Sequence, residues 1–187
     1  MAPVSIERVS AGRAVWMALI VAAGAALSLV FACATPFAAL ATVAALKTEW
    51  RDTVAIVGLV WLVNQVIGYG FLGYPWTWDS VAWGVAIGLA AGMALLAAIA
   101  LAPRRSGSFA ISLPFVGAFA AYEFSLYLAS FVLPAEADAF SLVVVRQVFV
   151  VNAVALIGLV SVHWLASVAG LLDGRHDDTF GPALSAR

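Results

Sequence analysis

The stretch AVWMALIVAAGAALSLVFACATPFAALATVAA, residues 14–45, decides the fold that the sequence predicts. It is almost entirely apolar, but Pro36 interrupts it, and proline disfavours helical backbone in the residue before it. We therefore predict a first helix over residues 13–33 and a short, proline-led second helix over residues 36–45. A membrane span needs ~20 residues, so only the first of these helices is long enough to cross a bilayer. The second must be a half-span or a tilted helix whose irregular flanking backbone is covered by protein.

The composition of the whole chain predicts a polytopic membrane protein. Of its 187 residues, 65% are hydrophobic and 10% are charged, whereas apolar residues make up about half of a soluble domain. The net charge of −1 and the lack of a basic cluster argue against a nucleic-acid partner. Cys33 is the single cysteine, which excludes an internal disulfide, and no residues have metal-site spacing. We predict neither a metal nor a cofactor, the one alternative being a Cys33 thiolate bound to a metal-containing cofactor such as cobalamin.

The rest of the chain predicts four more helices separated by polar turns. They cover residues 53–71, 80–101, 109–132 and 140–172. The last is longer than a span needs, so it begins outside the hydrocarbon layer or tilts strongly. Residues 1–12 form a polar leader and residues 173–187 a flexible polar tail. The predicted fold is an all-α integral membrane protein, a six-helix bundle over residues 13–172.

The basic residues predict the orientation of these helices. With six helices, one membrane face receives Arg8, Arg13, Lys47, Arg51, Arg104, Arg105 and Arg175. The loops on the other face, residues 73–79 and 134–139, contain neither Lys nor Arg. The positive-inside rule therefore predicts that both termini are cytoplasmic.

A ladder of small residues runs along the first predicted helix. Ala14, Ala18, Ala22 and Ala26 recur every fourth residue and so share one face. In lipid, helices associate through close backbone approach, which such a ladder permits. We predict that these four alanines, the Ala ladder, form an interface with a partner helix, either in this chain or in another subunit.

This arrangement resembles the S components of energy-coupling-factor (ECF) transporters, the membrane subunits that capture vitamins and related micronutrients. Members of that family have about this length and six helices, and their first helix carries an Ala-x-x-x-Ala pattern that docks on a coupling subunit. The layout from Thr35-Pro36-Phe37 to Leu72-Gly73-Tyr74-Pro75 is similar to the biotin-specific branch, although the last helix lacks that branch's polar pattern. The resemblance implies a multi-pass protein of the bacterial inner (plasma) membrane, with a coupling subunit and ATPases as partners.

Polar side chains inside the predicted spans are candidates for ligand binding, because they are costly in lipid and have binding or packing roles there. Asn64 and Gln65 lie in the middle of the third helix, and Tyr69 shares a face with Gln65. Interhelical hydrogen bonds and ligand contacts are equally good explanations of these residues.

An acid and a base inside the predicted spans form a second group of candidates. Glu123 follows Tyr122 in the fifth helix, and Arg146 lies near the start of the sixth, ahead of Asn152. The topology brings the end of the fifth helix and the start of the sixth to one membrane face. The two charges can therefore form a structural ion pair or share a ligand.

Aromatic residues gather where the third and fourth helices meet. Trp76, Trp78 and Trp83, with Tyr74, have two open interpretations: an interfacial aromatic belt, or a lid over an outward-facing pocket, where S components take their ligand. The predicted substrate-binding residues are Asn64, Gln65, Tyr69, Trp76, Trp78, Trp83, Tyr122, Glu123, Arg146 and Asn152.

Three functions are compatible with these patterns. We favour capture of a vitamin or similar small molecule for uptake, as the resemblance implies. The alternatives are a noncatalytic membrane subunit or assembly factor that docks through the Ala ladder, and a small secondary transporter in which Glu123 is a proton or cation site. The sequence has no nucleophile–base set and no phosphate-binding loop, so we do not predict an enzyme.

Overall fold

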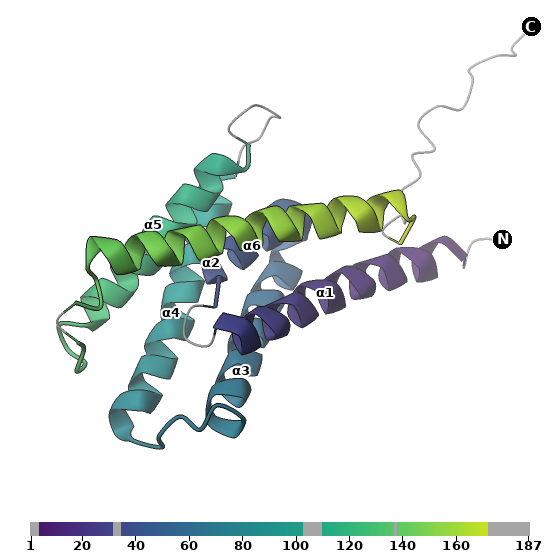
Figure 1. The fold of residues 1–187 in the computed structure, drawn as a ribbon. Helices are drawn as coiled ribbons and strands as arrows, with labels where there is room; N and C mark the ends of the chain where they lie inside the picture. The colour runs from purple at the N-terminus through teal and green to yellow at the C-terminus, as the bar shows by residue number, and fades with distance from the viewer. Residues whose placement is uncertain (1–3, 32–34, 103–109, 137, 172–187) are drawn as a thin grey trace, which may run out of the picture.

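The computed structural model describes residues 4–31, 35–102, 110–136 and 138–171. All regular secondary structure in these segments is helical. Six helices follow one another along the chain (Figure 1): α1 (Val4–Phe31), α2 (Phe37–Lys47), α3 (Trp50–Gly70), α4 (Trp78–Leu101), α5 (Ser112–Ala129) and α6 (Leu142–Val168). The number of helices and the short second helix agree with the sequence prediction.

The ends of the helices differ from the predicted ends in ways that polar residues explain. α1 begins at Val4, so part of the polar leader is helical. α3 begins at Trp50, earlier than predicted, and its first turn contains Asp52, which pairs with Arg13 of α1. α6 ends at Val168 and is shorter than predicted. Cys33, Arg104, Arg105 and the predicted tail, residues 173–187, lie outside the described residues.

The short helix α2 forms the centre of the molecule. All of its residues from Phe37 to Ala44 are buried, and it contacts α3, α4, α5 and α6. It begins directly after Pro36, as the break in the apolar stretch predicts. Protein on all these sides covers α2 itself, as expected for a helix that is too short to span a membrane.

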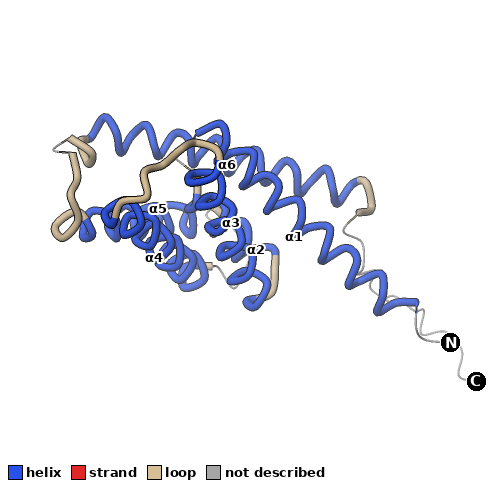
Figure 2. The backbone as a smooth tube through the Cα atoms, turned by 90° about the horizontal axis from the view of Figure 1, so that it is seen from below, coloured by secondary structure: helices blue, strands red, loops and turns tan. Residues whose placement is uncertain are grey.

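Within the described segments, three helices are long and apolar enough to cross a membrane by length and composition. These are α3 with 21 residues, α4 with 24 and α6 with 27, and they support the prediction of a membrane protein. α3 and α4 form an antiparallel hairpin, and α1 and α6 are inclined across it, as both views of the backbone show (Figures 1 and 2).

The helix α1 packs on α3 through one face only. Trp16, Ile20 and Gly24 are buried and recur every fourth residue. A Cβ atom at Gly24 would lie 2.8 Å from a methyl carbon of Val60, so the absence of a side chain lets the two helices approach closely. Trp16 also meets His163 of α6, with ring centroids 4.8 Å apart.

Candidate functional site

The seam between α3 and α4 joins long side chains of one helix to small residues of the other. The hydroxyls of Tyr69 and Ser80 are 3.1 Å apart, and Trp61 Nε1 donates to the Gly84 carbonyl over 2.8 Å. The Gln65 amide lies against Gly84, where a Cβ atom would overlap it. These polar groups are half-buried between two helices that can each span a membrane. The seam therefore brings an amide, a phenol and an indole together between the two helices.

The small residues of this seam were not among the predicted site residues, although the sequence contains a signal for them. Ser80, Gly84 and Gly88 recur every fourth residue, which puts them on one face of α4. A Cβ atom at Gly88 would lie 2.8 Å from Trp61. The spacing is the one that marked the ladder of α1, but here it forms a groove for side chains of α3.

Two of the predicted binding residues instead hold the beginning of α2. Asn64 donates to the Thr35 hydroxyl over 2.8 Å. Asn152 of α6 accepts from the Ala39 backbone N–H over 3.2 Å and donates to the Val148 carbonyl over 3.0 Å. Asn152 thus supplies, from another helix, the acceptor that an N-cap side chain normally provides. For these two residues the structure favours the interhelical hydrogen bond over ligand contact.

The amides of Asn64 and Gln65 connect this buried region with the seam. Gln65 Nε2 donates to Asn64 Oδ1 over 3.0 Å. A chain of polar contacts therefore runs from Thr35, at the start of α2, to the interface of α3 and α4. Gln65, at the end of that chain, and Tyr69, one turn further along α3, are half-buried, and they remain the candidates for ligand contact.

The predicted candidates on α5 and α6 do not form a common site. Tyr122 is buried and packs on Phe37, with ring centroids 5.9 Å apart. Glu123 is half-buried, whereas Arg146 is exposed on α6. Among the described residues the ion pairs are those that Arg13 makes, so Glu123 and Arg146 are not paired. The inward-facing arrangement expected for Arg146 is absent because its side chain lies on the exposed face of α6.

An aromatic cluster, which we define as Tyr69, Tyr74 and Trp76, closes one end of the seam. The ring centroids of Tyr69 and Trp76 are 4.5 Å apart, and those of Tyr69 and Tyr74 are 6.0 Å apart. Trp76 is 79% exposed. Trp78, the next tryptophan, is 69% exposed and begins α4. The cluster therefore places the exposed ring of Trp76 next to the polar groups of the seam, with Tyr69 belonging to both.

Trp83 links the beginning of α4 to the loop between α5 and α6. Its Nε1 donates to the Pro134 carbonyl over 2.8 Å. The bond joins residues near the two loops that lack Lys and Arg, as expected if both lie at the same face of a membrane.

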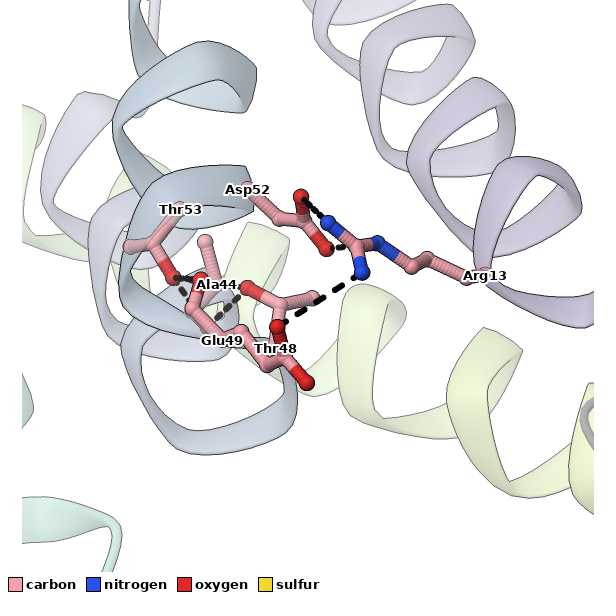
Figure 3. Close-up of polar contacts among 6 residues, drawn as sticks. All are labelled: Arg13, Ala44, Thr48, Glu49, Asp52 and Thr53. Atoms are coloured by element: carbon pink, nitrogen blue, oxygen red, sulfur yellow. Dashed lines mark hydrogen bonds and ion pairs between the residues drawn. The ribbon is translucent and has the colours of Figure 1, made fainter. Parts of the chain in front are cut away.

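An ion pair fastens α1 to the start of α3 at the opposite end of the hairpin (Figure 3). Arg13 Nη2 and Nε each lie 2.5 Å from an oxygen of Asp52, a bidentate arrangement. The Asp52 side chain is only 8% exposed. Arg13 Nη1 is also 3.5 Å from Glu49 Oε2, and this second contact lies at the surface.

Hydroxyl groups tie the same turn to the end of α2. The hydroxyls of Thr48 and Thr53 lie 2.7 Å apart, and each also donates to the Ala44 carbonyl (Figure 3). The turn between α2 and α3 is thus internally bonded, which gives Arg13 a fixed partner. The pair and the buried contacts of Trp16 and Ile20 together set the rotation of α1.

The Ala ladder faces away from the rest of the described chain. Ala14, Ala18, Ala22 and Ala26 are all exposed. Each ladder alanine is two residues away from Trp16, Ile20 or Gly24 of the packed face. Two residues correspond to a rotation of about 200° around a helix, so the ladder lies on the opposite side of α1. The question that the sequence left open, whether the partner helix lies inside this chain, has a clear answer for the described residues: none of their helices covers the ladder.

The described residues hold no group of three His, Cys, Asp or Glu side chains that could bind a metal ion. No protein-family model, curated protein or solved structure matches the chain. The resemblance to S components therefore rests on the residues of the chain itself.

Proposed function

We propose that this protein is the substrate-capture subunit of an uptake system for a vitamin or similar micronutrient, of the S-component type, in the bacterial inner membrane. One observation carries the proposal: the exposed Trp76 packs on the half-buried Tyr69, whose hydroxyl meets Ser80 in the α3–α4 seam beside the half-buried Gln65. Aromatic faces with a few convergent polar groups are typical of sites for small molecules.

The proposed capture step uses the seam as the site. A ligand arrives at the aromatic cluster from the extracytoplasmic face, the face whose loops lack Lys and Arg. It then takes hydrogen bonds from Gln65 and Tyr69, the latter in exchange for the bond of the Tyr69 hydroxyl with Ser80 of α4. The hydrogen bonds of Asn64 and Asn152 keep α2 in place while α3 and α4 adjust.

Transport in this proposal requires a partner, because the sequence contains no nucleotide-binding motif. The exposed Ala ladder is the proposed docking face for a coupling subunit, which would associate with ATPases. Small residues allow close approach of a partner helix in lipid. The ion pair of Arg13 and Asp52 keeps that face directed outward.

The test is to extract small molecules from purified full-length protein and identify them by mass spectrometry. Wild type should release one compound in near-stoichiometric amount, and Trp76→Ala should release at least tenfold less. Trp50→Ala is the matched control, because Trp50 is 67% exposed at the other end of α3. Protein that never carries or binds a small molecule would refute capture.

A second candidate function, a noncatalytic membrane subunit or assembly factor, is favoured by the exposure of the Ala ladder. It predicts a permanent protein partner and no ligand. Ala22→Leu would then release the partner, while Trp76→Ala would have no effect on any property of the complex.

A further inference from the structure

We propose that the aromatic cluster of Tyr69, Tyr74 and Trp76 binds a small organic cation, such as a methylated pyridinium or a quaternary ammonium group. This inference rests on the proposed function, because it names the substrate class of the same site. Three properties of the site carry it: the arrangement of the rings, their fixed positions and the charge around them.

The rings present aromatic faces in more than one direction. Tyr69 is the central ring, and Trp76 is tilted to it by 35° while Tyr74 is nearly perpendicular at 80°. A cation is attracted to the negative face of an aromatic ring, most strongly to tryptophan. Because Trp76 is 79% exposed, its ring is accessible to a ligand, and Tyr69 lies next to it.

The backbone holds this arrangement before any ligand arrives. The Tyr74 N–H donates to the Gly68 carbonyl over 3.0 Å. Gly73 has a φ of 69°, a backbone conformation that residues other than glycine rarely adopt. A Cβ atom at Gly68 would lie 2.6 Å from the Tyr74 ring, so glycine lets that ring pack against α3. A preformed site loses little conformational entropy on binding.

The charge at this end of the molecule is negative. Asp79 lies in the first turn of α4, beside the Ser80 that meets Tyr69. Glu136 and Asp138 lie in the loop that Trp83 bonds at Pro134, and both are exposed. Neither loop contains Lys or Arg, and Arg146 is exposed further along α6. Carboxylates near a binding surface raise the local concentration of cations and repel anions.

The same groups disfavour the other ligand classes. An anion would meet carboxylates and no basic side chain in either loop. A bare divalent ion needs converging oxygen ligands, and the described residues contain no such group of three. An organic cation of this kind is weakly hydrated and flat or compact. It can therefore contact the aromatic rings and be attracted by the carboxylates at the same time.

The test compares three probes that differ mainly in charge: 1-methylnicotinamide, a cation, nicotinamide, which is neutral, and nicotinate, an anion. Binding to full-length protein in nanodiscs of neutral lipid is measured by equilibrium dialysis. The cation should bind at least tenfold more tightly than either analogue. One aromatic face contributes about 2- to 30-fold to cation binding. Trp76→Ala should therefore weaken it by that factor and Trp76→Phe by less, while Trp50→Ala should leave it unchanged.

A cation that binds no more tightly than nicotinamide and nicotinate, or that binds Trp76→Ala as well as wild type, would overturn the assignment. This failure is distinguishable from failure of the proposed function. A compound extracted from wild type and lost from Trp76→Ala would leave capture standing with a different substrate class, whereas absence of any bound compound would remove both.

Discussion

Leucine substitutions at Gly24 and Ala22 test which face of α1 packs on α3 and which face is exposed. A Cβ atom at Gly24 would lie 2.8 and 2.9 Å from two methyl carbons of Val60, whereas ordinary carbon contacts are ~3.5–4.0 Å. Gly24→Leu therefore forces α1 away from α3. Overpacking of this kind costs ~1–3 kcal/mol, or about 5- to 140-fold in the unfolding equilibrium. Ala22 is exposed, so Ala22→Leu should change the free energy of unfolding by less than ~0.5 kcal/mol.

The assay is reversible unfolding of the full-length protein in bicelles, titrated with SDS and followed by tryptophan fluorescence. Both variants receive the same side chain on the same helix, two residues apart. Replacing glycine by leucine also raises helix propensity by roughly 0.8 kcal/mol, so a loss of stability in Gly24→Leu must come from overpacking against α3. Only Gly24→Leu should be destabilised, and only Ala22→Leu should interfere with a partner helix while the monomer stays intact. Equal destabilisation of both variants, or of Ala22→Leu alone, would refute the assignment of the two faces.

Two further predictions concern α2 and the seam. Asn152→Leu leaves the buried Ala39 N–H without its acceptor and should destabilise the protein by ~1–2 kcal/mol in the same unfolding assay. Gln147→Leu, at an exposed position of α6, is the control and should not destabilise it. Equal destabilisation by the two substitutions would contradict a capping role for Asn152. Gly84→Leu should displace the Gln65 amide and reduce the amount of extracted ligand at least tenfold. Gly92→Leu is its control, because a Cβ atom there meets no atom within 4 Å, and a similar loss in both variants would argue against a ligand site at the seam.

The sequence predicted the central feature of the fold because that feature depends on local chemistry. Pro36 alone is enough to divide the apolar stretch, and the helix after it is too short to span a membrane. Hydrophobicity then separates the remaining helices at their polar turns. The ends of α1 and α3 were harder to predict, because they include charged residues such as Arg13 and Asp52. These two residues are far apart in the sequence and pair only in the folded protein.

The candidate site was predicted less well, because its geometry depends on rotation and register. Asn64 and Gln65 are neighbours in the sequence, yet Asn64 bonds Thr35 while Gln65 reaches α4. Which of them faces α2 depends on how α3 is rotated, and nothing near them in the sequence specifies that. Arg146 shows the same limit: its depth along α6 was foreseeable, but its exposed face was not.

The central claim is that a small molecule binds at the α3–α4 end of the protein while the Ala ladder faces a partner. The most direct measurement is native mass spectrometry of full-length protein released gently from bacterial membranes. We expect wild type to carry a small molecule that is missing from Trp76→Ala, and a partner subunit that is missing from Ala22→Leu. A wild-type protein that carries no small molecule, with or without a partner, would contradict the account.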